Sequence, residues 1–134
     1  MKPYTDQTAL NAVVAHSRKQ PEKSQSPFGA GCQYRGPHGL MCFVGALIPE
    51  PEMQQMLSRN ESLNTRCVTE VVREPEIEDL FSQVNPALLS RIQKVHDTKR
   101  VQDWDAALRR VARDCELAFP EVAQPEPSKD LQHI

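Results

Sequence analysis

Apolar side chains recur at every third or fourth position over several stretches of the chain, which is the spacing of one face of an α-helix. The clearest stretch begins at Val101 and ends before Pro120. Its apolar positions are Val101, Trp104, Leu108, Val111, Cys115 and Phe119. Arginines and acids occupy the other side, as on a solvent-exposed helix face. The pattern predicts a last helix that reaches Phe119.

Shorter segments with the same spacing predict further helices. Residues 5–19 begin with Thr5 and Asp6, whose side chains are suited to capping free amides. Residues 85–97 begin with an asparagine cap and a first-turn proline. Prolines also open two short helices, around residues 49–57 and 75–81. Residues 65–72 fit either helical turns or a strand, because their valines favour strands.

All five glycines of the chain lie between positions 29 and 45. Residues 36–39, Gly-Pro-His-Gly, are a turn signal between two arms of alternating apolar side chains, residues 32–35 and 40–44. This arrangement predicts a β-hairpin over residues 31–45.

The register of the hairpin follows from which side chains share a face. Directly opposed residues of an antiparallel pair point to the same side. A loop with an odd number of residues places four apolar side chains on one buried face: Cys32, Tyr34, Cys42 and Val44. Met41 and Phe43 then lie on the opposite, exposed face. Residues 42–48 are open to either a continuing strand or a short helix.

The sequence therefore predicts an α+β fold that is mostly helical, with about five helices packed around one β-hairpin (residues 31–45). A chain of 134 residues fits one domain. We expect this domain to span residues 1–119. Residues 120–134 are rich in proline and charge and are expected to form a disordered tail that folding does not need.

The charge pattern narrows the class of partner. The net charge is −2, so the chain lacks the basic excess of nucleic-acid-binding proteins, and nucleic acid is not the expected partner. Residues 50–80 hold eight acids and three arginines. They form either a solvated acidic edge or a face that docks on a basic partner surface.

No apolar run is long enough to cross a membrane, and the first residues form a polar amphipathic segment rather than a signal peptide. We therefore expect a cytoplasmic protein with reduced cysteines and no cofactor.

The glycine-rich stretch also carries a resemblance. Its motif is C-x-Y-R-G-P-x-G-L-x-C-x-V-G-x-L-I-P over residues 32–49, with weaker similarity through residues 51–53, 96–97 and 104–117. The motif resembles a family of small uncharacterised proteins encoded by bacteriophages and prophages. The bulky Met41 and Phe43 depart from the family pattern, which has polar or small residues there. The resemblance implies a phage origin and a place in the bacterial host cytoplasm, and it carries no activity.

Cysteines and a histidine in this stretch raise the possibility of a metal site. Zinc requires nitrogen or sulfur ligands in a tetrahedron. Cys32, Cys42 and His38 are the candidate ligands, although the two cysteines lack the usual knuckle spacing. Cys67, His96 and Cys115 could complete a site only through the tertiary fold. Structural burial of the thiols is the favoured interpretation.

A cysteine hydrolase is the enzymatic alternative, with Cys42 as nucleophile, His96 as base and Asp97 as orienting acid. Such a site needs a thiolate and a base within hydrogen-bond reach. His96 falls on the apolar side of its helix, where a packed, hydrogen-bonded histidine is the commoner outcome. The sequence favours a non-enzymatic role.

Arg35 precedes the predicted turn and points away from the buried cysteine face. It either bonds carbonyls of the turn or, with His38, recognises a partner at an exposed hairpin tip. Met41 and Phe43 on the same side would then form an apolar patch of the kind that protein interfaces use.

The favoured function is that of a small soluble interaction protein of phage type. It would bind and modulate a host bacterial protein, for example a component of bacterial defence. The alternatives are the hydrolase, a metal-binding module, or a nucleic-acid-binding module that uses the arginines of the last helix.

Overall fold

The computed structural model describes residues 2–25 and 32–121, and these residues form a mostly helical single domain. Within them there are five α-helices and four 3₁₀ segments. The α-helices are α1 (Asp6–Lys19), α2 (Glu50–Arg59), α3 (Val68–Val71), α4 (Pro86–Thr98) and α5 (Trp104–Asp114). The 3₁₀ segments are η1 (Pro37–Gly39), η2 (Gly45–Leu47), η3 (Glu61–Thr65) and η4 (Val101–Asp103).

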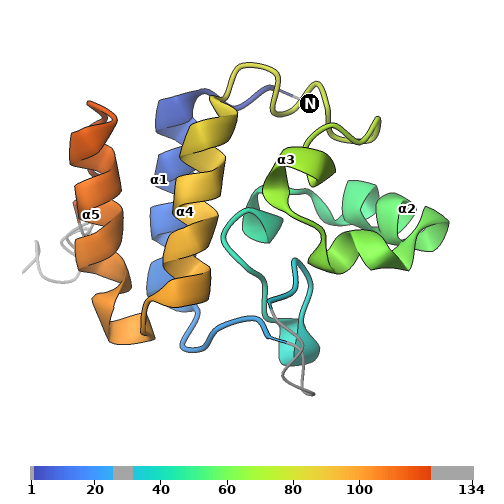
Figure 1. Ribbon diagram of the computed structural model, residues 1–134, viewed down its shortest axis with the longest axis horizontal. Helices are drawn as coiled ribbons and strands as arrows, with labels where there is room; N and C mark the ends of the chain where they lie inside the picture. Colours follow the sequence, from blue (N-terminus) through green and yellow to red (C-terminus); the bar gives the residue numbers. More distant parts are fainter. Residues whose placement is uncertain (1, 26–31, 122–134) are drawn as a thin grey trace, which may run out of the picture.

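Helices α1, α4 and α5 lie side by side as one group, and α2 and α3 lie on the other side of α4 (Figure 1). Helix α3 packs on α4, and η2 packs on α1. The chain around η2 passes between the two groups of helices, and η1 lies at the lower edge of the view (Figure 1). Side chains from this segment therefore enter the core between the helices.

The main helices begin where their capping residues predict. Thr5 accepts from the backbone N–H of Thr8 and forms a reciprocal capping box with it. Asn85 accepts from the backbone N–H of Ala87, and Pro86 occupies the first turn of α4. The predicted helices over residues 5–19 and 85–97 are confirmed. Residues 65–72, left open between helix and strand, contain the short helix α3 (Val68–Val71).

The predicted hairpin is wrong for the described residues, which contain no strand and form two isolated antiparallel bridges, Gln25–Cys32 and Arg35–Met41. The Arg35–Met41 bridge has the expected odd register, but pairing stops there. The N–H of Tyr34 donates to the carbonyl of Asn64 at 3.1 Å, and that of Arg35 to its Oδ1 at 2.8 Å. A remote asparagine thus accepts the Tyr34 N–H that would have bonded to Cys42 in this register, and it also holds the outward-facing N–H of Arg35. The described residues are mostly helical rather than α+β.

Phe43 lies in the core, and its predicted exposure is wrong. Its ring is fully buried and lies 4.7 Å from the Trp104 ring and 5.2 Å from the His96 ring, centroid to centroid. The alternation expected of a strand fails because the chain turns after Cys42, whose carbonyl accepts from the N–H of Ala46 at 2.9 Å. The segment then continues as η2, which resolves the ambiguity over residues 42–48 in favour of a short helix. Met41 is half-buried.

Two other predicted helices differ in extent. Residues 75–81 form successive hydrogen-bonded turns rather than a helix, yet Ile77, Leu80 and Phe81 are buried there. The last helix ends at Asp114, short of Phe119. Leu117 donates its N–H to the carbonyl of Ala112 at 2.8 Å, a bond that closes the helix and reverses the chain.

The reversal after α5 places Glu116 at φ +56°, in the left-handed region, which is unfavourable for residues other than glycine. We expect Glu116→Gly to raise the free energy of unfolding by about 0.5–1 kcal/mol, because glycine adopts this conformation without steric cost. Urea denaturation followed by circular dichroism measures the change. Glu116→Ala is the matched control: it removes the same charge but keeps Cβ, so it should bring no such gain.

Candidate functional site

Cys42, the proposed nucleophile, is sealed in the core with 1% of its surface exposed. Burial raises the pKa of its thiol far above the ordinary value, despite the hydrogen bond that its Sγ accepts from the N–H of Gly45 at 3.2 Å. A buried neutral thiol can neither reach a substrate nor attack it. The hydrolase based on Cys42 is therefore wrong.

His96, the proposed base, is fully buried and bonded through both ring nitrogens. Its Nε2 lies 3.0 Å from the backbone nitrogen of Ser24, which is a donor, so Nε2 accepts. Its Nδ1 lies 2.9 Å from Oδ1 of Asp97, so the proton sits on Nδ1. Because the backbone already occupies the one free lone pair, His96 cannot take a proton from a substrate without losing the Ser24 bond.

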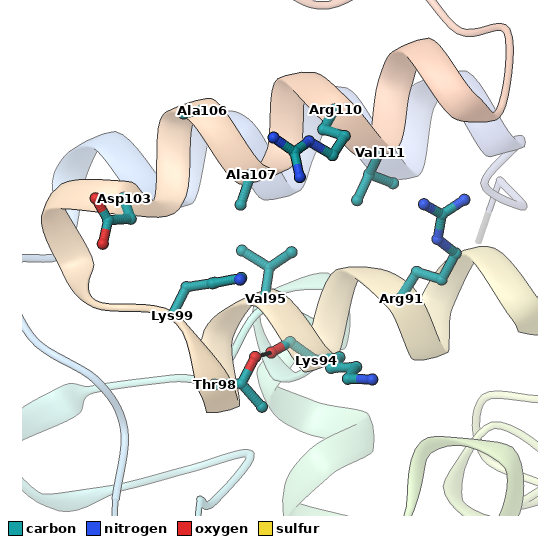
Figure 2. A pocket seen from close by; sticks show the side chains of 10 residues that line it. All are labelled: Arg91, Lys94, Val95, Thr98, Lys99, Asp103, Ala106, Ala107, Arg110 and Val111. Atoms are coloured by element: carbon teal, nitrogen blue, oxygen red, sulfur yellow. Dashed lines mark hydrogen bonds between the residues drawn. The ribbon is translucent and has the colours of Figure 1, made fainter.

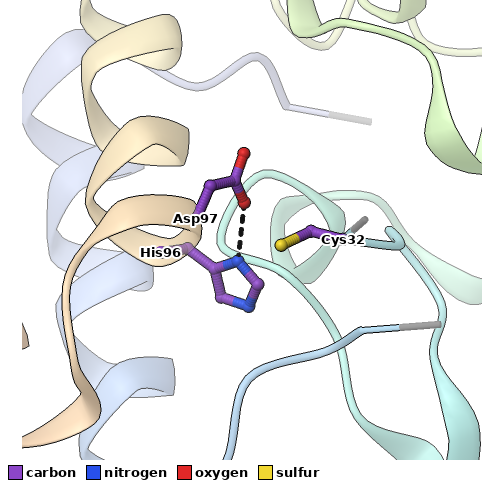
Figure 3. Close-up of side chains that lie close together, drawn as sticks. All are labelled: Cys32, His96 and Asp97. Atoms are coloured by element: carbon purple, nitrogen blue, oxygen red, sulfur yellow. Dashed lines mark hydrogen bonds and ion pairs between the residues drawn. The ribbon is translucent and has the colours of Figure 1, made fainter. Parts of the chain in front are cut away.

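The thiol that approaches His96 and Asp97 is that of Cys32, from the bridge to Gln25 (Figure 3). The ligand-type atoms of these three side chains all lie within 4.8 Å of one another. Burial and the hydrogen bond to the Asp97 carboxylate raise the pKa of Cys32 to about 12. Burial alone would raise the pKa of Asp97, but hydrogen bonds from His96, Cys32 and Gln93 outweigh it and hold that pKa below its usual value. The Cys32 thiol beside Asp97 is therefore protonated at neutral pH, which makes it a poor nucleophile.

The cluster does not fit a metal ion. A metal on Nδ1 of His96 would leave the ring proton on Nε2, where it would face the N–H of Ser24, and two donors would meet. Histidine ligands normally donate from the second nitrogen to a carboxylate or carbonyl, the reverse of this arrangement. The predicted set of Cys32, Cys42 and His38 is not brought together within residues 2–25 and 32–121, since only Cys32 belongs to the cluster.

The thiols should differ in their rate of alkylation under native conditions. Cys67 is exposed, Cys32 and Cys115 are half-buried, and Cys42 is buried. We expect iodoacetamide to modify Cys67 first, and Cys42 only after the protein is denatured, as measured by mass spectrometry of peptides. Modification of Cys42 before denaturation would show that its thiol is accessible and would support the hydrolase hypothesis again.

Arg35 is engaged inside the molecule. Its guanidinium donates to the carbonyls of Gly45 at 2.6 Å and Ile48 at 2.7 Å, and to Glu50 at 2.9 Å. These bonds tie the chain after the bridge to the start of α2. His38 is exposed in the η1 turn at φ +59°. With Phe43 buried and Met41 half-buried, the four predicted binding residues do not form one exposed patch.

Sequence reasoning missed a groove between α4 and α5, with a volume of about 490 Å³ (Figure 2). Val95 and Ala107 face each other across it, and Val111 extends the apolar floor (Figure 2). Its rim is basic, with one acid: Arg91, Lys94, Lys99, Arg110 and Asp103. The helix pattern marked the arginines of α5 as a solvated face, and no local signal reveals that cations from α4 meet them.

The cations of this groove differ in their pairing. Arg91 is paired with Asp114 at 2.9 Å, and the rim acid Asp103 is paired with Arg100 at 3.0 Å. Lys94, Lys99 and Arg110 form no ion pair with any residue the structure describes. Three cations that line the groove therefore have no acidic partner among residues 2–25 and 32–121.

A second cavity, of about 390 Å³, lies on the other side of α4. Cys32, Tyr34, Cys67 and Asp97 contribute to its lining. Lys94 and Thr98 line both cavities. Burial raises the pKa of the Tyr34 phenol well above its ordinary value, and its hydroxyl donates to the carbonyl of Arg66. The Tyr34 hydroxyl and the Cys32 thiol of this cavity are therefore protonated or already bonded, which leaves the α4–α5 groove as the stronger candidate site.

Among the described residues, no helix is both long and apolar enough to cross a lipid bilayer. Comparison of the chain with protein-family models, with curated protein sequences and with solved structures finds no match in any of the three.

Proposed function

We propose that this protein is a non-enzymatic interaction protein whose α4–α5 groove binds an acidic, amphipathic helical segment of a partner protein. The observation that carries the proposal is the set of cations that line the groove and form no ion pair with a described residue: Lys99 and Arg110 point toward the apolar floor, and Lys94 lies at the outer edge (Figure 2). Carboxylates of the partner would neutralise the rim, and its apolar side chains would cover the floor.

The dimensions of the groove suit such a segment. Its volume of about 490 Å³ lies within the range of about 300–1,000 Å³ typical of ligand-binding clefts. Ala106 and Ala107 present only methyl groups on the α5 side, so a partner backbone can approach closely. The helix-in-groove mode of recognition uses such an arrangement, with apolar anchors between two helices.

An acidic protein segment fits better than nucleic acid. Binding of a phosphate backbone favours an extended surface of one sign. Here Asp103, Asp105 and Asp114 lie along α5 beside its arginines, and the whole chain has a net charge of −2. The apolar floor has no role in contacting phosphates, whereas it can bury leucine or valine side chains of a helix.

The resemblance of residues 32–49 to phage-encoded proteins supports a host bacterial protein as the source of this segment. In that setting the protein would modulate its target by occupying a surface, as a counter-defence protein does, rather than by chemistry. The sealed Cys42 and the doubly bonded His96 support this non-enzymatic role.

The test is fluorescence anisotropy with a labelled helical peptide that carries leucines on one face and glutamates on the other. Lys94→Glu with Arg110→Glu should weaken binding by about tenfold or more. Lys2→Glu with Arg73→Glu is the matched control: both residues are exposed and lie outside the groove, and the change in net charge is the same.

Equal loss of affinity in both double variants would mean that only overall charge matters, and the proposal would fail. Binding of double-stranded DNA that depends on Lys94 and Arg110, with no binding of the peptide, would favour the nucleic-acid alternative. Affinity for the peptide should fall with added salt, because the rim charges are exposed.

A further inference from the structure

After α5, residues 117–121 turn back and lie against α1 and α5; we call them the C-terminal strap. Gln7 of α1 recognises its backbone through a reciprocal pair of hydrogen bonds. The Gln7 Nε2 donates to the carbonyl of Ala118 at 2.8 Å, and the N–H of Ala118 donates to Gln7 Oε1 at 2.9 Å. The side-chain amide of Gln7 thus bonds to both the N–H and the carbonyl of one strap residue.

Two arginines hold the rest of the strap. The Arg109 guanidinium lies 4.2 Å from the centre of the Phe119 ring, and that of Arg18 lies 5.5 Å from it. Arg18 also donates to the carbonyl of Pro120 at 2.8 Å. Arg109 further grips both carboxylate oxygens of Glu121, at 2.9 and 3.3 Å. Arg18 therefore contacts the ring and a backbone carbonyl, and Arg109 contacts the ring and the acid.

This is how a protein binds a short peptide: main-chain hydrogen bonds fix its position, and separate contacts select its side chains. The strap contacts lie at the surface. Ala118 and Glu121 are exposed, and Phe119 is only half-buried. Exposed ion pairs are individually weak. The reversal before the strap also holds Glu116 in a left-handed conformation, which disfavours the docked state.

We infer that the α1–α5 face is a second recognition surface, distinct from the α4–α5 groove, and that the strap occupies it in cis. The partner it fits is a peptide segment with an aromatic residue, a proline and an acid in succession. The strap competes with such a segment at a high effective concentration because it belongs to the same chain. The partner binds only when the strap has left the surface, so the strap lowers the apparent affinity of the surface for the partner.

The test uses the full chain and a labelled, end-capped peptide with the sequence of residues 116–121, followed by fluorescence anisotropy. Phe119→Ala with Glu121→Ala weakens the strap but leaves its binding surface intact. This variant should bind the peptide at least about tenfold more tightly than the wild type, because its own strap competes less.

The receptor side supplies matched controls. Adding Arg109→Ala to the strap variant should abolish the gain, whereas adding Arg113→Ala, an exposed arginine of α5 that lies outside the groove, should leave it unchanged. A peptide with alanine in place of its phenylalanine should not bind. If the strap variant loses its helical circular dichroism, Glu121→Gln alone is tested against the same criteria. A strap variant that binds no better than wild type, or equal effects of Arg109→Ala and Arg113→Ala, would overturn the inference.

Discussion

Replacing Phe43 with alanine is expected to lower the free energy of unfolding by about 3–5 kcal/mol. The ring is fully buried and makes edge contacts with Trp104 and His96 between the two groups of helices. Removing it leaves a cavity that rigid neighbours on α4 and α5 cannot fill. Urea denaturation followed by circular dichroism provides the measurement.

Met41→Ala is the control, because the sequence pattern assigned Met41 and Phe43 to the same exposed face. Met41 is half-buried, and its carbonyl, which the substitution keeps, accepts from Gln20 at 2.8 Å. We expect a loss well below that of Phe43→Ala. Similar losses of stability for the two substitutions would contradict the burial of Phe43. A negligible loss for Phe43→Ala would indicate that its side chain is exposed, as the sequence pattern predicts.

Replacing His96 with alanine is expected to lower the free energy of unfolding by about 2–5 kcal/mol. The N–H of Ser24 would lose its acceptor inside the protein, a penalty of about 1–3 kcal/mol for a buried donor. The ring is also stacked on Trp104, with centroids 5.5 Å apart, and its removal leaves a cavity there. The same urea denaturation measures this loss.

His96→Gln separates the two contributions, because its side-chain oxygen can still accept from the N–H of Ser24. We expect it to recover part of the stability lost in the alanine variant. Adding zinc or a chelator should leave the thermal unfolding midpoint of the wild type unchanged, since the tautomer of His96 disfavours a metal. A zinc-dependent rise of this midpoint that requires Cys32 would instead establish a metal site.

The parts of the fold that the sequence predicts are those governed by local chemistry. The cap at Asn85 and the proline after it begin α4 where expected, and the apolar spacing of α5 places Trp104 and Leu108 in the core. The concentration of glycine also marks tight geometry correctly. A Cβ at Gly45 would lie 2.9 Å from Cα of Tyr34, so this position accepts no side chain without a shift of the backbone.

The parts that the sequence does not predict depend on remote contacts. The hairpin fails because the carbonyl of Asn64 accepts the Tyr34 N–H and the chain turns after Cys42. The prediction of a site with Cys42, His96 and Asp97 is wrong for a related reason. His96 and Asp97 are adjacent in sequence, but the thiol beside them is that of Cys32. No spacing rule distinguishes two cysteines whose positions are fixed by a loop crossing α4. Likewise, the groove requires cations from two helices to meet.

Trp104 is the only tryptophan of the chain, and this gives the protein a single indole, which can be excited apart from its two tyrosines, at the centre of its helical group. The indole is 2% exposed, and within the described residues its buried Nε1 has no hydrogen-bond partner. An indole so shielded from water emits at shorter wavelengths than one in solvent. A shift of the emission to longer wavelengths therefore reports the opening of the interface between α4 and α5 without any attached label.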